Sequence, residues 1–250
     1  NSTGISLLFT IDTALPTVAK LCQRVEIKRV IVTRLNDYAG AKETAAKPPE
    51  LEKGWLYFSA VLAGCTATRR PRVAIAPTDP ALIQFTGGTT GVPKGAVLSH
   101  GNVISATIGK SLWISPIAQL TPPERRCFLG AIPFFHIYGN IAIINMSVFN
   151  CATQILVPQF QPDEMMDTLA KYREILLFPT VPTMINAVIS HPRAEALRLD
   201  KKLGMLNSGG APIPVETIHR IKDMGIYFGE GWSMSETCCA GTQNPILGLS

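Results

Sequence analysis

The chain has 250 residues, of which 46% are hydrophobic and 16% are charged. This balance fits one large or two small globular domains with a substantial core, and it excludes a disordered or fibrous chain. The formal net charge of +5 is spread along the sequence without a dominant basic block, so nucleic-acid binding is not indicated.

The six cysteines and four histidines show neither a C-x-x-C pair nor the spacing of a metal site. Most of the cysteines lie in apolar sequence, where a reduced, buried thiol is the usual interpretation. Cys238 and Cys239 are neighbours, but a disulfide between adjacent residues is strained. The apolar runs at 55–65 and 141–157 are too short or too interrupted for a membrane span. We therefore expect a cytoplasmic location, with peripheral membrane contact left open for the full protein.

Residues 1–80 are predicted to contain the end of one α/β subdomain and a linker. Apolar runs at 5–10 and 29–33 predict two strands, and residues 16–25 between them show helical spacing. A strand, a helix and a strand in this order favour a parallel sheet. The elements expected next are a loop over 34–53, a short helix over 54–63 and an extended, proline-rich segment over 67–80.

Residues 81–250 alternate between predicted strands and helices. A strand at 81–85, a loop at 86–95 and a strand at 96–98 come first, followed by a helix over 100–113 with Ser99 as its N-cap. Later strands are expected at 127–132, 154–157, 175–178, 203–207 and 226–228. Later helices are expected at 138–149, 162–172, 181–190 and 212–224, the last one capped by Gly225. This alternation predicts an α/β fold with layered sheets covered by helices.

The glycine-rich loop is the segment most typical of anion binding. It reads Phe85-Thr86-Gly87-Gly88-Thr89-Thr90-Gly91-Val92-Pro93-Lys94-Gly95. Glycines permit conformations in which successive N–H groups converge on a phosphate, threonine hydroxyls add donors, and Lys94 adds a positive charge. A flexible turn would explain one glycine but not the hydroxyls and the lysine. A Walker loop does not fit, because Pro93 and Gly95 flank the lysine.

This loop resembles the phosphate-binding signature of the adenylate-forming superfamily, which includes acyl-CoA synthetases, luciferases and peptide-synthetase adenylation domains. Further segments resemble motifs of that family, in the family order. They are Pro133-Phe134-Phe135-His136-Ile137-Tyr138-Gly139, Phe178-Pro179-Thr180-Val181-Pro182-Thr183-Met184, Gly209-Gly210-Ala211-Pro212-Ile213-Pro214 and Gly231-Trp232-Ser233-Met234-Ser235-Glu236-Thr237. The closest similarity is to long-chain fatty-acid CoA ligases, and it covers essentially the whole chain.

Taken alone, each of these segments also has an ordinary structural explanation. Gly209 fits a strand-to-helix turn, and His136 after two phenylalanines fits a packed side chain. Glu236 fits a solvated acid at a helix start. Trp232 and Ser233 depart from the Tyr and Gly that are common in the family. The order of the segments favours the functional interpretation.

The resemblance implies roles for individual residues. The β- and γ-phosphates of ATP would be bound by Thr86, Gly87, Gly88, Thr89, Thr90, Gly91 and Lys94. Adenine and the acyl group would lie against Gly209, Gly210, Ala211, Gly231 and Trp232. Ser235 would contact the α-phosphate, Glu236 would ligate Mg²⁺, and His136 would line the carboxylate side. The predicted catalytic residues are Lys94, His136, Ser235 and Glu236.

The implied reaction is the ATP-dependent activation of a carboxylic acid, expected to be a fatty acid, to an acyl-adenylate and then to a coenzyme A thioester. His136 stands where amino-acid-activating relatives carry an Asp, which argues for an acid without an α-amino group. The alternatives are an aryl or bile-acid CoA ligase and a non-catalytic nucleotide-binding module. The resemblance also implies that the chain is part of the large N-terminal domain, without the C-terminal catalytic domain. Such a fragment is expected to be inactive alone, and its oligomeric state stays open.

Overall fold

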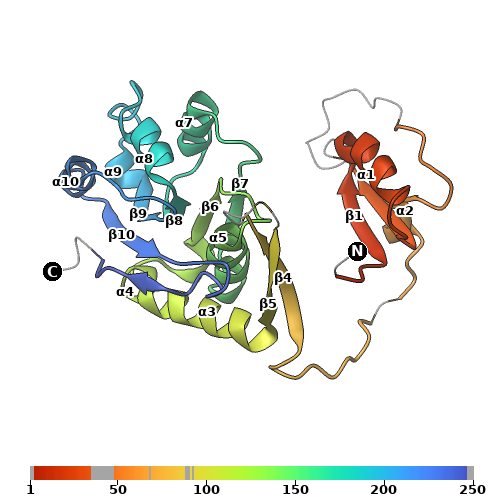
Figure 1. Ribbon diagram of the computed structural model, residues 1–250. Helices are drawn as coiled ribbons and strands as arrows, with labels where there is room; N and C mark the ends of the chain where they lie inside the picture. The colour runs from red at the N-terminus through yellow and green to blue at the C-terminus, as the bar shows by residue number, and fades with distance from the viewer. Residues whose placement is uncertain (1–2, 35–47, 68, 88–90, 92, 247–250) are drawn as a thin grey trace. The chain divides into compact units, whose positions relative to one another are not determined.

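The computed structural model describes residues 3–34, 48–67, 69–87, 91 and 93–246. The chain forms two compact units, Asn1–Val73 and Ala74–Ser250 (Figure 1). The boundary lies within the segment predicted to be extended, in which the described residues from 69 to 79 are exposed and form no helix or strand. Three prolines in this segment remove backbone N–H donors, which disfavours regular structure.

The first unit is a three-stranded parallel sheet with two helices. Its strands are β1 (Leu7–Ile11), β2 (Arg29–Thr33) and β3 (Leu56–Tyr57), in the order β1-β2-β3. Its helices are α1 (Leu15–Cys22), which follows a 3₁₀ turn at Asp12–Ala14, and α2 (Phe58–Ala63). Val18 of α1 belongs to a small core with Val30 and Val32, which lie on one face of β2 because side chains alternate along a strand. The predicted strand, helix and parallel strand are therefore confirmed.

The second unit contains a hairpin and a six-stranded sheet. The hairpin strands are β4 (Pro80–Thr86) and β5 (Lys94–Ser99), which are antiparallel. The sheet strands are β6 (Cys127–Gly130), β7 (Thr153–Leu156), β8 (Ile175–Thr180), β9 (Leu203–Ser208), β10 (Tyr227–Trp232) and β11 (Thr242–Gln243). Their order is β11-β10-β9-β8-β6-β7, and all neighbours are parallel except the edge strand β11.

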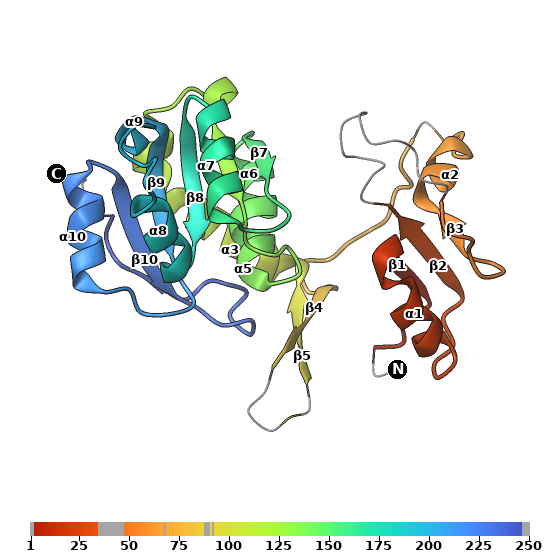
Figure 2. The same cartoon turned by 90° about the horizontal axis from the view of Figure 1, so that it is seen from above.

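Helices cover both faces of this sheet (Figure 2). One face carries α3 (His100–Trp113), α4 (Ser115–Ala118), α5 (Ile137–Gly139) and α6 (Met146–Phe149). The other face carries α7 (Pro162–Lys171), α8 (Pro182–Ile189), α9 (Leu199–Lys202) and α10 (Val215–Asp223). A 3₁₀ turn at Pro123–Arg125 precedes β6, and a π-helical segment at Asn140–Asn145 joins α5 to α6.

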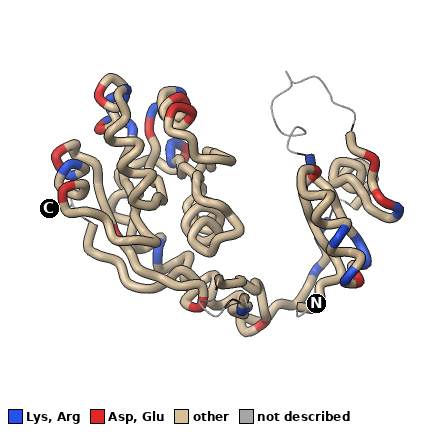
Figure 3. Tube along the Cα trace, turned by 45° about the horizontal axis from the view of Figure 1, so that its top comes forward, with Lys and Arg blue, Asp and Glu red and all other residues tan. Residues whose placement is uncertain are grey.

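Two hydrophobic cores result from this layering. Phe128 faces the core under α3, whereas its neighbour Leu129 faces the core under α7 and α8. The strands are apolar on both faces, as expected for a covered parallel sheet. Glu230 is the one charged residue in the six strands, and most charges lie on helices and turns (Figure 3). No helix in the described residues is both long and apolar enough to span a membrane.

The α/β class is confirmed, and β2 and α3 have the predicted bounds. Ser99 caps α3 as predicted: its Oγ accepts from Asn102 N at 3.2 Å, and Asn102 Oδ1 accepts from Ser99 N at 2.9 Å. The predicted helix over 54–63 is wrong at its start, because Leu56–Tyr57 pairs with β2 as an edge strand. The predicted helix over 138–149 is interrupted by the π-helical segment.

Two further predictions need correction. The cysteines were expected to be mostly buried, but Cys65 and Cys151 are exposed, and the structure describes all six cysteines as free. The C-cap of α10 is Met224, and Gly225 follows it with a φ of 70°. Glycine fits that position because other residues rarely adopt a left-handed conformation.

Candidate functional site

A cavity of about 520 Å³ lies at the carboxyl-terminal ends of β8, β9 and β10. In an open parallel sheet, the turns that follow neighbouring strands meet at this edge, which is where ligands usually bind. Its walls include Val181 after β8, Gly209 and Gly210 after β9, residues 231–235 around the end of β10, residues from the turn before α5, and Lys110 of α3.

Six of the predicted site residues line this one cavity. They are His136, Gly209, Gly210, Gly231, Trp232 and Ser235. They come from three segments that are far apart in the sequence, and the parallel strand order brings these segments to the same edge. The cavity volume is within the range usual for small-molecule sites.

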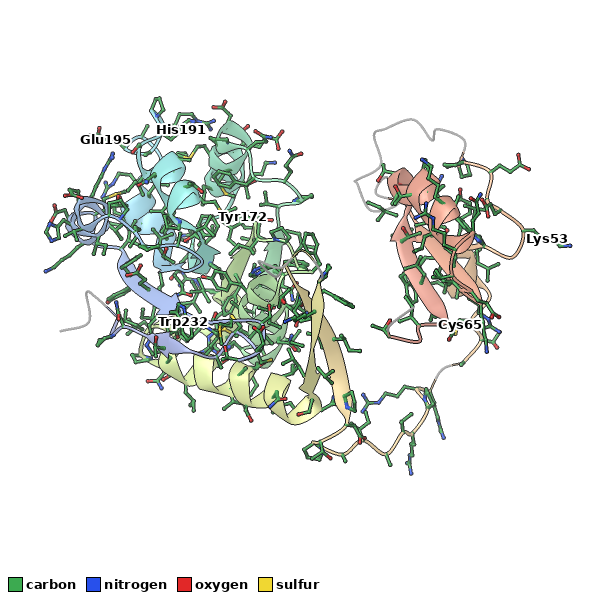
Figure 4. The ribbon with its side chains drawn as sticks, viewed as in Figure 1. Lys53, Cys65, Tyr172, His191, Glu195 and Trp232 are labelled. Carbon is green, nitrogen blue, oxygen red and sulfur yellow. The ribbon has the colours of Figure 1, made fainter. Side chains whose placement is uncertain are left out.

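A second hollow of about 410 Å³ adjoins the cavity. Ala211 lines this hollow, and Gly210, Gly231 and Trp232 line both spaces. Trp232, at the end of β10, is 59% exposed, so its indole offers a large apolar surface to a planar ligand (Figure 4). The two hollows therefore meet at the end of β10 that carries the indole.

The turn after β9 is held from both sides. Gly209 N donates to Thr180 O of β8 at 3.2 Å, and Ile213 N donates to Glu230 Oε1 of β10 at 3.3 Å. Gly210 has a φ of 82°, a conformation that strongly favours glycine. The backbone at 209–210 therefore borders the cavity in a fixed conformation.

His136 forms the N-cap of α5. Its Nδ1 accepts a hydrogen bond from Tyr138 N at 3.1 Å. In the neutral ring, an accepting Nδ1 leaves the proton on Nε2, which is then a donor. Phe135 beside it is 83% exposed, so the rim of the cavity carries a large apolar side chain next to the imidazole. This pair can contact a carboxylate and its apolar neighbourhood.

A buried polar network lies beneath the cavity. Tyr138 Oη is 2.8 Å from Asn207 O and 2.9 Å from Asn207 Oδ1, and Thr180 Oγ1 donates to Asn207 O at 3.0 Å. Asn207 Nδ2 donates to Gly229 O at 3.2 Å, which joins β9 to β10. Burial raises the pKa of the Tyr138 hydroxyl far above its ordinary value, so it stays protonated. The network fixes α5 against the strand ends that carry the site.

The predicted phosphate loop lies in the β4–β5 hairpin. Gly88, Thr89 and Thr90 are outside the described residues; Gly87 is exposed, and Gly91 has a φ of 83°. Thr86 ends β4 and Lys94 begins β5, and the two are paired. Lys94 was predicted to be in the loop, but the antiparallel pairing extends to it and includes it in the strand.

The described residues of the predicted loop do not line the cavity. The hairpin nevertheless touches the cavity rim through one hydrogen bond. Gln84 Nε2 of β4 donates to Phe135 O at 3.0 Å. Most of the predicted site residues thus lie either on the cavity wall or in the hairpin, and the hydrogen bond to Phe135 links the two places.

Glu236, the predicted Mg²⁺ ligand, is exposed and does not line the cavity, although Ser235 before it does. Its turn is held by Thr237, whose Oγ1 accepts from Met234 N at 3.0 Å. No group of three or more His, Cys, Asp or Glu side chains among the described residues could hold a metal ion. A magnesium ion that bridges phosphates needs only one or two carboxylates, so a single glutamate is chemically sufficient.

Most of the other residues that line the cavity were not predicted as site residues. Among them are Lys110, Tyr138, Asn207 and Gln243. The sequence does contain a signal for Lys110. The lysine lies four and three residues after the buried Ala106 and Thr107, so the predicted helix places it on the inward face. Tyr138 and Asn207 act through side-chain contacts that no local pattern reveals.

Comparison with known proteins agrees with this description. A family model described as AMP-binding enzyme matches residues 1–248. A long-chain-fatty-acid–CoA ligase of Bacillus subtilis is 28% identical over 98% of this chain and 45% of that protein. An indoleacetate–CoA ligase of Aromatoleum aromaticum is 30% identical over 76% of this chain and 35% of that protein. The chain thus spans less than half the length of these relatives.

Solved structures share the fold. The N-terminal domain of FACL13 from Mycobacterium tuberculosis matches 97% of this chain and 67% of that chain, with a TM-score of 0.69 and 23% identity. A luciferase from Phrixothrix hirtus matches 96% of this chain and 44% of that chain, with a TM-score of 0.73 and 21% identity. The predicted similarity to the N-terminal domains of acyl-CoA synthetases is therefore confirmed for the fold, and the chain belongs to the family of AMP-binding enzymes.

Proposed function

We propose that the protein containing this chain is an AMP-forming acid–thiol ligase. It activates a carboxylic acid with ATP and transfers the acyl group to coenzyme A. The observation that carries this proposal is the convergence of His136, Gly209 and Trp232 on one cavity at the carboxyl ends of a parallel sheet. Membership of the family and the names of the relatives, which are CoA ligases, support it.

The reaction has two steps. A carboxylate oxygen of the acid attacks the α-phosphorus of ATP, a new O–P bond forms, and the bond to the β-phosphate breaks to release pyrophosphate. The sulfur of coenzyme A then attacks the acyl carbonyl carbon, and AMP leaves. Positioning and charge stabilisation supply most of the catalysis in such reactions.

The residues of this chain have distinct tasks in the proposal. His136 donates from Nε2 to the substrate carboxylate, and Ser235 donates its hydroxyl to the α-phosphate. Trp232 packs against adenine, and the backbone at 209–211 borders the adenine and the acyl group. In the hairpin, Lys94 places a positive charge near the β- and γ-phosphates, together with Thr86, Gly87 and Gly91 and the residues between them.

Glu236 is the residue that would hold Mg²⁺. Its carboxylate is exposed and has no hydrogen bond or ion pair with another described residue, so it is free to bind a cation. A bound Mg²⁺ would neutralise phosphate charge. One carboxylate plus phosphate oxygens and water suits this hard cation.

A fatty acid is the first substrate class that we propose, because the sequence of the phosphate loop is similar to that of fatty-acid CoA ligases and a relative bears that name. An aryl acid is the second, since 4-coumarate–CoA ligase 2 of Oryza sativa is 27% identical over 99% of this chain. We also propose that residues 81–250 are the AMP-binding subdomain and that residues 1–80 complete a preceding α/β subdomain.

An exchange assay with the intact protein tests the proposal. Radioactive pyrophosphate should enter ATP only when a carboxylic acid is present, because exchange requires a reversible acyl-adenylate. Fatty and aryl acids should support exchange, and α-amino acids should not, since His136 replaces the acid that would bind an ammonium. A lack of acid-dependent exchange across the panel would overturn the ligase assignment, and a preference for α-amino acids would overturn the substrate class.

A further inference from the structure

The buried face of α3 contains one residue that breaks its pattern. Val103, Ala106, Thr107, Ser111 and Ile114 pack toward the core at spacings of three and four residues. Lys110 lies on the same face and is half-buried on the wall of the cavity. A lysine at an inward position is unusual, because burying an unpaired charge is costly.

The other polar side chains of this face have partners within the chain. Thr107 Oγ1 donates to Val103 O at 2.7 Å, and Ser111 Oγ accepts from Asn150 Nδ2 at 2.9 Å. Lys110 has no hydrogen bond or ion pair with any described residue. Its ammonium group is therefore without a partner among the described residues.

The described part of the cavity wall contains a basic side chain but no acidic one. Among the described residues that line the cavity there is no aspartate or glutamate, and Lys110 is the one lysine or arginine. Apolar side chains such as Ile132, Ile137 and Val181 form much of the remaining wall. In apolar surroundings an ammonium group attracts an anion more strongly than it does in bulk water.

Lys110 also lines a second, smaller space. Lys110, Asn207 and Gln243 line both the cavity and this crevice. The rest of the crevice wall is apolar and comes from the end of α3, the π-helical segment, the start of α6 and β8. The volume of this crevice is only about 10 Å³, at the lower limit for one water molecule. A ligand in the cavity therefore cannot extend into this crevice past the lysine.

Gln243 adds a second polar group, because it lines both spaces with Lys110. Its side chain lies against Gly231, where a Cβ atom would come within 3.0 Å of Gln243 Cγ and Nε2. The amide has no hydrogen bond with another described residue. An ammonium and an amide thus border a largely apolar cavity, on different elements from His136.

We propose that Lys110 is a specificity-determining residue that binds a second carboxylate at the far end of the acyl substrate. The inference rests on the proposed ligase function and refines its substrate class. The preferred acid then has a short or medium apolar chain with a carboxylate at each end. One carboxylate reacts with ATP, and the other pairs with Lys110 with support from Gln243.

Matched acids test this inference in the intact protein. The kcat/KM of pyrophosphate exchange is measured for octanoate and octanedioate, and for a shorter pair, hexanoate and hexanedioate. The parent should prefer the diacid of each pair, and Lys110→Met should lower the diacid-to-monoacid ratio by about ten- to a hundredfold, the usual effect of a charged hydrogen bond. Lys110→Arg should retain the preference, and Lys110→Glu should shift it toward the ω-amino acid of equal length. Lys171→Met, which changes an exposed lysine of α7 outside the cavity, is the control.

The possible results distinguish a failure of the ligase assignment from a failure of the inference about Lys110. If no acid supports exchange, the ligase function itself fails. If exchange occurs but the parent prefers monoacids, or Lys110→Met leaves the ratio unchanged, only the inference about Lys110 fails. An equal loss for both acids with a raised KM for ATP would assign Lys110 to a phosphate and would also overturn the inference. Should Lys110→Met not fold, judged by its melting temperature, Lys110→Gln replaces it.

Discussion

Tyr138 offers a direct test of the polar network beneath the cavity. The residue is only 8% exposed, and its hydroxyl contacts both Asn207 O and Asn207 Oδ1. Tyr138→Phe removes the hydroxyl and keeps the ring that packs in the core under α3. The change therefore isolates the hydrogen bond from the apolar contacts.

The expected cost follows from the partners that remain. Asn207 O keeps the hydrogen bond from Thr180 Oγ1, so it stays satisfied. Asn207 Oδ1 loses the one described donor that it has. A net hydrogen bond contributes about 1 kcal/mol, and an unsatisfied buried acceptor adds a similar penalty, so the free energy of unfolding should fall by about 1–3 kcal/mol.

Urea unfolding of the intact protein measures this change. Tyr172→Phe is the control, because Tyr172 is 36% exposed and no described residue bonds its hydroxyl; Figure 4 shows it well away from Trp232. The control should change the free energy of unfolding by less than about 0.5 kcal/mol. Equal effects of the two substitutions would refute the claim that the network anchors α5 to β9.

Three shorter predictions follow from other parts of the chain. Lys94→Ala should slow pyrophosphate exchange at least about tenfold without lowering the melting temperature, because Lys94 is exposed; equal exchange rates would remove its phosphate role. Gly109→Ala in α3 should raise the free energy of unfolding by about 0.5–1 kcal/mol, whereas Gly139→Ala should lower it, since its Cβ would overlap a backbone carbonyl. Burial raises the pKa of Cys238 to about 11, so at pH 8 a thiol reagent should label exposed Cys65 and spare protonated Cys238 until the protein is denatured; equal labelling rates would contradict this.

The elements that sequence predicts well are those with local signals. Strand β2 is a β-branched run, and α3 begins at a serine whose capping partner Asn102 is three residues further on. The short strand β3 was missed because its two residues belong to an apolar run that also fits a helix. Its pairing with Ile31 and Val32 of β2 is a tertiary contact, which local periodicity does not encode.

The π-helical segment between α5 and α6 is a second feature that local periodicity does not predict. An uninterrupted helix over 138–149 is what apolar periodicity predicts. In the structure Asn145 Nδ2 donates to both the backbone O and the Oδ1 of Asn140, at 2.9 Å each. This contact spans five residues, which matches the wider turn of a π-helix. Two asparagines at that spacing are too weak a signal to be read from the sequence alone.

The site could be predicted in its segments but not in its arrangement. The rule that ligands bind at the carboxyl ends of parallel strands explains why Gly209 and Trp232 lie close together. It says nothing about the hairpin, whose described loop residues lie outside the cavity walls. The hydrogen bond from Gln84 to Phe135 O is the described contact that links the two groups. Since His136 follows Phe135 directly, this hydrogen bond joins β4 to the segment whose histidine lines the cavity.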